Sequence, residues 1–328
     1  MLRMTPFELV SARSLDEAVD LHSAVPGALY VAGGTDLLPN IKQGLFSPPR
    51  VVNIAGALPA GIREESDQIV IGAGTRLSQL ARSAALPALA AAAGLVAGPQ
   101  IRNMGTIGGN ILLDTRCLFY NQTAHWRASL GHCLKAEGSW CHVVGGPKTC
   151  VAAQSSDTVP VLLTLDARIR LRGSGGDRLL PLRELYAFNG MKHLKIEPGE
   201  LLTEVVVPRP AAGTVGSYSK LRTRDAIDFP QLGLAVSLRQ EDGAIAALDI
   251  VVGAINPQPK LVPGLHAFVG RALDTLVIEE IAELVFQRSR PQGSVAGDVA
   301  WRRQMARVYT RRALRQMGGL RDSEEAAA

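Results

Sequence analysis

The sequence has no long uninterrupted hydrophobic run and no recognisable export signal. Its longest stretch of small apolar residues, LPALAAAAGLVAG at positions 86–98, is broken by Pro87 and Gly94 and is too short to span a bilayer. The N-terminal segment MLRMTPFELVSARSLDEAVDL lacks the apolar core that a secretory signal needs. We therefore expect a soluble cytoplasmic protein that does not associate with a membrane.

The distribution of positive charge argues against nucleic-acid binding. The 328-residue chain carries a net charge of +5, but its arginines concentrate in WRRQMARVYTRRALRQM at positions 301–317. Apolar residues recur there at helical spacing, namely Trp301, Met305, Val308 and Leu314. This pattern predicts a helix whose arginines are solvated or face another subunit, not one that contacts nucleic acid.

Cysteines are scarce, and all four lie close together in the chain. Cys117, Cys133, Cys141 and Cys150 are separated by 15, 7 and 8 residues, so there is no CxxC pair and neither a zinc ribbon nor a ferredoxin-type run. Structural disulfides are not expected in a reducing compartment. Four thiolates suffice for a [4Fe-4S] cluster, but a structural zinc could use the same sulfurs or exchange one for His125, His132 or His142. The spacing leaves iron–sulfur, zinc and no metal as open alternatives.

Hydrophobic periodicity predicts a mixed α and β chain. Helices are expected at 14–25, with Ser14 as N-cap and Glu17 in the capping-box position, at the Ala-rich stretch 86–95, and from about 272 onward. VPVLLTLDARIRLRG (159–173) and LLTEVVVPRP (201–210) are predicted to be strands joined through the turn GSGGD. Residues 213–255 show the pattern of a three-stranded antiparallel meander. The segment PRPAAGTVG (208–216) is the best domain boundary, and the few residues after Arg321 are expected to be unstructured.

Two glycine turns stand out against the absence of both common nucleotide-binding motifs. LYVAGGTDLL (29–38) and RNMGTIGGNI (102–111) each place paired glycines next to a helix start, where backbone N–H groups can approach a phosphate. Alone, GGTD is more often a tight turn with an Asp N-cap. However, the two turns lie about 70 residues apart in a chain without GxGxxG or GxxxxGK[ST]. Together they indicate a dinucleotide held outside a Rossmann or P-loop frame.

AGGTDLL and NMGTIGGNI together resemble the FAD-binding subunits of the molybdenum hydroxylases, the xanthine oxidase family. The resemblance continues through SDTVPVLLTLDARIRL, LLTEVVVP and SYSKLRTRDAIDFPQLG, so it covers nearly the whole chain. It implies an α+β fold: a two-subdomain FAD-binding region of the PCMH (vanillyl-alcohol-oxidase-like) type, then an α+β C-terminal domain with a three-stranded antiparallel sheet and helices. The domains would span 1–212 and 213–328, the second of the CO dehydrogenase flavoprotein type. One departure is DFP at 228–230, where many relatives carry Asp-Ile-Ala.

The same resemblance implies which residues bind FAD. Those that would contact the cofactor are Tyr30, Val31, Ala32, Gly33, Gly34, Thr35, Asp36, Leu37, Thr106, Ile107, Gly108, Gly109, Asn110, Asp157, Leu202 and Lys220. The first thirteen would wrap the pyrophosphate and ribityl chain, and the last three lie around the cofactor and its ring in the family. Asp157 could instead be a turn residue, Leu202 a core residue and Lys220 a surface charge.

The cysteines lie in an insertion, at about 112–155, that most subunits of this family lack. Within the family, the flavin subunits of the 4-hydroxybenzoyl-CoA reductases resemble this segment, with LLDTRC leading to YNQ, WR and CHV. The resemblance implies a [4Fe-4S] cluster on Cys117, Cys133, Cys141 and Cys150. We expect Phe119, Tyr120, Trp126 and Trp140 to exclude water from it or to form a small core in the loop.

The resemblance also implies a role and partners. The chain would be an electron-transfer subunit with FAD, without a catalytic residue for the organic substrate. It would assemble with a molybdenum-cofactor large subunit and a small [2Fe-2S] subunit, as a dimer of heterotrimers. A low-potential donor such as ferredoxin would supply electrons for removal of a phenolic hydroxyl from an aryl-CoA thioester. The open alternatives are a related hydroxylase with another aromatic or heterocyclic substrate, and a zinc-stabilised non-enzymatic module.

Overall fold

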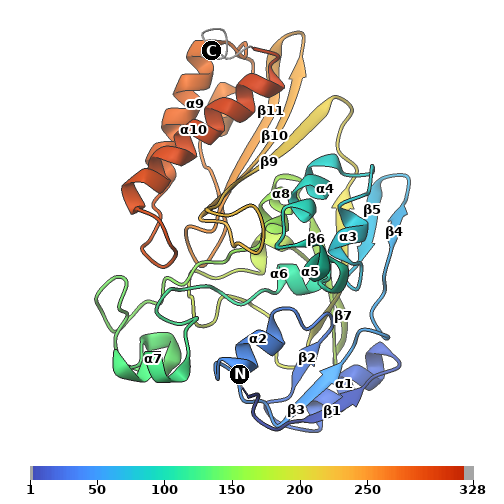
Figure 1. Cartoon of the computed structure of the whole chain (residues 1–328). Coiled ribbons are helices and arrows are strands. Elements are labelled where there is room, and N and C mark those ends of the chain that lie inside the picture. The colour runs from blue at the N-terminus through green and yellow to red at the C-terminus, as the bar shows by residue number, and fades with distance from the viewer. Residues whose placement is uncertain (1–2, 321–328) are drawn as a thin grey trace.

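The computed structural model describes residues 3–320 and begins with a small unit around a three-stranded parallel sheet (Figure 1). Its strands lie in the order β1-β3-β2, with bounds β1 Glu8–Ser11, β2 Leu29–Val31 and β3 Arg50–Asn53. Two helices connect them, α1 Leu15–Ser23 and α2 Leu37–Lys42. Ser14 caps α1 as predicted, because its Oγ accepts from the Glu17 backbone N at 3.1 Å. The Glu17 carboxylate returns to the Arg13 N–H instead of that of Ser14.

The second unit contains a five-stranded sheet in the order β4-β5-β8-β6-β7, with all pairs antiparallel. The strands are β4 Ile62–Glu64, β5 Gln68–Gly72, β6 Arg168–Gly173, β7 Gly176–Pro181 and β8 Leu201–Pro208. Its helices are α3 Leu77–Leu80, α4 Pro87–Gly94, α5 Pro99–Met104, α6 Ile107–Ile111 and α8 Thr158–Thr164. The largest hydrophobic core of the described residues forms here and includes Ile71, Leu89 and Ile169, all fully buried.

The third unit is a four-stranded antiparallel sheet covered by two helices. The sheet has the order β12-β11-β10-β9, with β9 Thr214–Leu221, β10 Leu232–Glu241, β11 Ala244–Gly253 and β12 Lys260–Leu261. Helices α9 Thr275–Arg288 and α10 Val299–Met317 pack on each other and build a second core with it (Figure 1). The α+β architecture is confirmed, but the predicted three-stranded sheet gains the short strand β12.

Two local predictions are wrong. Val159 to Thr164 form helix α8, so the strand expected from position 159 begins only at Arg168. The Gly-rich turn joins β6 to β7, and β8 pairs with the other side of β6.

The basic helix α10 also differs from its prediction at several arginines, because Arg307 pairs with Glu283 and Arg311 with Glu279, both on α9. Arg302 is fully buried, and its guanidinium donates to the carbonyls of Gln231, Gln292 and Ala254 at 2.7–3.1 Å. Burial lowers its pKa to about 10, so it stays charged at neutral pH. Arg302 therefore joins three segments of the C-terminal unit instead of facing solvent or a partner.

No helix within residues 3–320 is both long and apolar enough to cross a membrane. The tail predicted after Arg321 lies outside the described residues.

Candidate functional site

The two glycine turns, defined here as 30–37 and 106–110, lie next to each other in space although they are far apart in sequence. A Cβ on Gly33 would sit 2.1 Å from the Met104 carbonyl oxygen, so the first turn packs directly on the residues leading into the second. Gly105 in turn faces Thr35, whose Oγ1 would lie 3.4 Å from an added Cβ. The fold therefore brings both turns to one place.

Glycine occurs at these positions of the two turns for different physical reasons. Gly34 has φ +69°, a conformation that side-chain-bearing residues rarely adopt. Gly108 is needed for packing, since its Cβ would lie 2.9 Å from that of Ala73. Gly109 is exposed, and a Cβ there would meet only Thr106 Oγ1, at 3.2 Å, among protein atoms. The fold itself thus leaves the space beside Gly109 open, which fits the approach of a phosphate group.

Thr106 and Asn110 fix the second turn on both sides. Thr106 caps α6 by accepting from the Gly109 backbone N at 3.1 Å. The buried Asn110 Oδ1 accepts from the hydroxyls of Ser156 and Thr158 at 2.6 and 2.7 Å. The second glycine turn is therefore tied to the start of α8.

Next to Ser156, Asp157 forms a buried charged pair with Lys220. The Lys220 Nζ lies 2.9 Å from Asp157 Oδ2, and the Tyr218 hydroxyl donates to Oδ1 at 2.8 Å. Burial raises the pKa of Asp157 to about 6, against the opposing effect of Lys220. The structure thus brings Asp157 and Lys220 together and rules out a surface position for Lys220.

Several other residues predicted to contact FAD have side chains that already pack or form hydrogen bonds within the protein. Leu202 and Ile107 are buried in the main hydrophobic core. Tyr30 donates its hydroxyl to the Gly199 carbonyl at 2.8 Å and stacks on His22. Val31 packs in a small core of the N-terminal unit. Contacts from these residues to a cofactor would have to come from the backbone or from one side of a packed ring.

Asp36 connects the first glycine turn to the insertion. It occupies the N-cap position of α2, but its side chain makes no capping hydrogen bond. Its carboxylate instead pairs with Arg116, the residue before Cys117, and accepts from Asn40. The Arg116 guanidinium also lies 4.5 Å from the ring centroid of Phe229. The DFP segment therefore contacts the arginine that connects the first glycine turn to the cysteines.

The insertion leaves and returns through a narrow neck between α6 and α8. Arg116 and Ala153 exchange two backbone hydrogen bonds at 2.7 and 2.8 Å. Beyond this neck the chain contains helix α7 Ala124–Ser129, and in Figure 1 it projects between the N-terminal and C-terminal units. Arg127 donates to the Gly44 carbonyl and the Leu118 N–H to the Ser294 carbonyl, both at 2.8 Å. The insertion is thus docked on both units.

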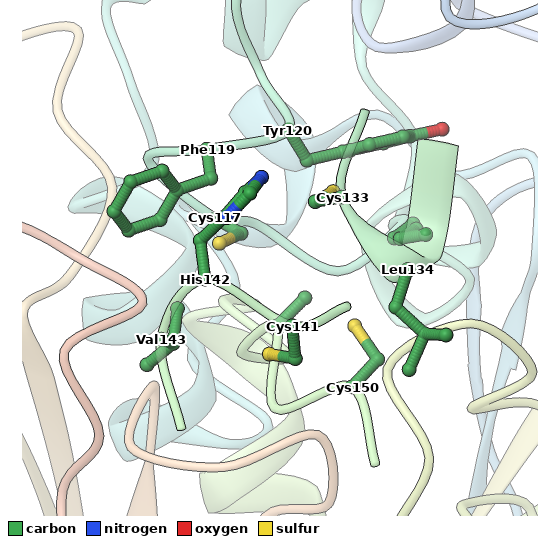
Figure 2. Close-up of a pocket in the computed structure, with 11 residues that line it drawn as sticks. Cys117, Phe119, Tyr120, Cys133, Leu134, Cys141, His142, Val143 and Cys150 are labelled. Atoms are coloured by element: carbon green, nitrogen blue, oxygen red, sulfur yellow. The ribbon is translucent and has the colours of Figure 1, made fainter. Parts of the chain in front are cut away.

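All four cysteines line one pocket inside the insertion. They are free thiols and 5–8% exposed. Figure 2 shows their sulfur atoms spread around a common space, with Phe119, Tyr120, Leu134 and Val143 at its walls. We call this the cysteine pocket. Four thiols around one apolar space match, in kind and number, the protein ligands that iron–sulfur clusters use.

Among the described residues, no group of three or more His, Cys, Asp or Glu side chains is arranged to hold a metal ion. Burial raises the pKa of Cys117 to about 12 and also raises the pKa of Cys150, so without a bound cation both thiols are protonated at pH 7.

The pocket lining differs in part from the prediction. Phe119 and Tyr120 line it, but the expected Trp126 and Trp140 do not, and Trp140 is half exposed. His142 lines the pocket with its Nε2 hydrogen-bonded to the Gly131 carbonyl. The pocket is also lined by Lys135, which the sequence did not predict. No pattern in the sequence distinguishes a lysine that becomes buried from one that stays exposed, so this position of Lys135 could not be predicted.

Comparison with known proteins gives the family. A model of the FAD-binding domain in molybdopterin dehydrogenases matches residues 5–210, and one of the CO dehydrogenase flavoprotein C-terminal domain matches 217–317. The medium chain of carbon monoxide dehydrogenase from Afipia carboxidovorans is 30% identical, over 94% of this chain and 95% of the relative. The xanthine dehydrogenase FAD-binding subunit of Escherichia coli O157:H7 is 27% identical, over 92% and 93%. A solved CO dehydrogenase from Oligotropha carboxidovorans has a TM-score of 0.78 at 27% identity, covering 97% of this chain and all of that one.

The chain belongs to the molybdenum hydroxylase family, as one of its FAD-binding subunits. It is a flavoprotein and an oxidoreductase subunit, with a PCMH-type FAD-binding domain and a CO dehydrogenase flavoprotein C-terminal domain. This membership speaks against the alternative of a non-enzymatic module.

Proposed function

We propose that the chain is the FAD and [4Fe-4S] electron-transfer subunit of a molybdenum-containing 4-hydroxybenzoyl-CoA reductase. The observation that carries the cluster is the cysteine pocket, in which four buried free thiols face one space. The names of the two matched relatives give FAD or only the size of the chain and mention no iron–sulfur centre. The cluster therefore depends on this pocket and on the resemblance of the insertion.

In this proposal, 1–212 is the FAD-binding domain, with the insertion at 112–155, and 213–328 is the C-terminal domain. The two glycine turns hold the FAD pyrophosphate, and the open side of Gly109 admits it. In this proposal the buried Asp157–Lys220 pair, at the start of α8 to which the second glycine turn is tied, lies near the cofactor. FAD, when bound, exchanges electrons with single-electron centres on either side. The thiolates of Cys117, Cys133, Cys141 and Cys150 hold the cluster.

The wider proposal concerns direction and partners. A cytoplasmic low-potential donor such as ferredoxin delivers electrons to this subunit, which passes them toward a small [2Fe-2S] subunit and a molybdenum-cofactor large subunit. The large subunit removes the phenolic hydroxyl of an aryl-CoA thioester during aromatic degradation. The relatives support a multi-subunit assembly, because their names call them a medium chain and a FAD-binding subunit. We propose a dimer of heterotrimers.

Metal analysis of the anaerobically purified full chain tests the cluster. We expect about four iron and four acid-labile sulfide per chain, without stoichiometric zinc. Cys141→Ser should lose most of the iron, because it removes one of four ligands. Ser129→Ala, at an exposed hydroxyl of the same insertion, is the control and should keep it. Stoichiometric zinc in the wild-type chain would refute the cluster.

A second candidate is the FAD subunit of a molybdenum enzyme with another aromatic or heterocyclic substrate. The range of matched relatives, from carbon monoxide to xanthine dehydrogenases, favours it equally. Substrate choice belongs to the large subunit in either case. Purifying the complex and assaying that subunit with 4-hydroxybenzoyl-CoA and with heterocycles separates the two proposals.

A further inference from the structure

A buried lysine faces the cysteine pocket. The Lys135 side chain is only 6% exposed, and its Nζ lies 2.7 Å from Asp114 Oδ1 and 2.5 Å from Thr115 Oγ1. Nζ also lies 4.6 Å from the ring centroid of Tyr120, which lines the pocket. The ammonium is therefore held in place by a carboxylate, a hydroxyl and an aromatic ring.

The two members of this ion pair differ in their relation to the cysteine pocket. Lys135 lines the pocket, whereas Asp114 does not. Lys135 is the one lysine or arginine among the described residues that line the pocket.

Other cations of the insertion are engaged or remote. Arg116 pairs with Asp36, and Arg127 donates to the carbonyls of Gln43 and Gly44. Lys148 is exposed on the surface. Of these cations, Lys135 is the one that lines the pocket, and because it is buried its charge acts there through protein instead of water, where screening is weak.

A [4Fe-4S] core with four thiolates carries a net charge of about −2 when oxidised and about −3 when reduced, since reduction adds one electron. A fixed cation nearby stabilises the more negative form. Cluster potentials depend on net charge and solvent exposure, and this pocket is largely closed to water. A positive charge at Lys135 therefore favours reduction.

We propose that Lys135 raises the reduction potential of the cluster held by the four cysteines and that Asp114, as its counter-charge, partly offsets this effect. The inference depends on the cluster proposed above. It makes Lys135 a residue that sets how readily the cluster accepts an electron from the donor.

The test is an anaerobic redox titration of the purified full chain, followed by the EPR signal of the reduced cluster after iron and sulfide have been counted. Lys135→Met should shift the reduction equilibrium at least tenfold toward the oxidised form, which is about 59 mV for one electron. Asp114→Asn should shift it the opposite way, because it removes a negative charge and leaves the lysine. Lys148→Met, which deletes an exposed lysine of the same loop, should leave the potential unchanged.

The signs of the two shifts in reduction potential distinguish an effect of charge from an effect of packing. A Lys135→Met variant that keeps all its iron and has an unchanged potential would overturn this inference but not the proposed cluster. Shifts in the same direction for Lys135→Met and Asp114→Asn would also overturn it, since they would report a loosened loop. If Lys135→Met loses its cluster, Lys135→Arg with a near-native potential and Asp114→Asn with a raised one support the inference. A lowered potential in Asp114→Asn overturns it. A wild-type chain without iron would refute the proposed cluster itself.

Discussion

At the scale of single residues, buried charge is the feature that the sequence could least reveal. Lys220 and Arg302 occur in patterns typical of exposed residues, yet Lys220 is 1% exposed as a side chain and Arg302 is fully buried. Each is stabilised by partners far away in sequence, Asp157 for one and three backbone carbonyls for the other. Periodicity describes which positions face the core, but not where a distant acceptor compensates a charge.

The Asp157–Lys220 pair gives a pH-dependent prediction. Lys220→Met leaves the Asp157 carboxylate buried without its cation, and we expect a loss of about 3–5 kcal/mol in the free energy of unfolding at pH 8. The wild-type pKa of Asp157 is raised to about 6, so its carboxylate and the attraction to Lys220 are fully present only above that pH. The cost of the substitution should therefore grow as the pH rises through about 6 and shrink below it.

Urea denaturation of the flavin-free full chain at pH 5 and pH 8 measures this cost. The double variant Asp157→Asn with Lys220→Met is the control, and it should recover part of the lost stability at pH 8. An equal cost at both pH values would show that Lys220 acts through packing alone.

At the scale of elements, the strand and helix pattern was largely predictable, and its errors have local causes. Residues 159–164 form an apolar run that periodicity alone cannot assign to a buried helix or a buried strand. The helix is fixed by contacts outside the run, in particular by the Asn110 side chain, which accepts hydrogen bonds at the start of α8. Pro160 fits the first helical turn, where no backbone donor is needed.

The glycine turns illustrate what was and was not predictable in the site. Both were found from their sequence, but their contact through Gly33 and Met104 was not, because about 70 residues of intervening chain must fold first. The cysteine spacing left three alternatives open, since the sulfurs converge only through turns in the insertion. The roles of the individual FAD contacts remain predictions.

Two glycine substitutions should separate binding from folding. Gly109→Ala places a Cβ on the open face of α6, so we expect near-native stability without flavin but at least tenfold weaker FAD binding, which is about 1.4 kcal/mol. Gly33→Ala places a Cβ against the Met104 carbonyl, and we expect a loss of about 1–3 kcal/mol in stability. Flavin fluorescence titration and thermal unfolding measure the two effects. Tight FAD binding by a well-folded Gly109→Ala chain would contradict the pyrophosphate assignment.

At the scale of the whole molecule, the insertion connects units that are distant in sequence. Arg127 contacts the N-terminal unit at Gly44, Leu118 contacts the C-terminal unit at Ser294, and Arg116 contacts the first glycine turn through Asp36. The neck at Arg116 and Ala153 closes without any cysteine. The cysteine pocket and the first glycine turn are therefore linked through Arg116 but built from different segments.

This separation predicts that FAD and the proposed cluster can be removed independently. Cys141→Ser should lose iron but keep most of its FAD, because both glycine turns and the neck hydrogen bonds lie outside the change. Gly109→Ala should do the reverse, since the only protein atom that a Cβ added at Gly109 would meet is Thr106 Oγ1, which does not belong to the cysteine pocket. In the reconstituted complex, reduction of flavin by a low-potential donor such as ferredoxin should then slow sharply in Cys141→Ser. Small dyes that reach the flavin directly should still reduce it at a near-native rate.

The measurements are cofactor content and stopped-flow reduction with both kinds of donor. An unchanged ferredoxin rate in an iron-free Cys141→Ser complex would remove the cysteine pocket from the path of electrons and leave the insertion as a structural clasp between the two units. Loss of both FAD and iron in Cys141→Ser would instead show that the two sites depend on each other through the link from Cys117 and Arg116 to Asp36. The first glycine turn would then need the intact insertion to keep its conformation.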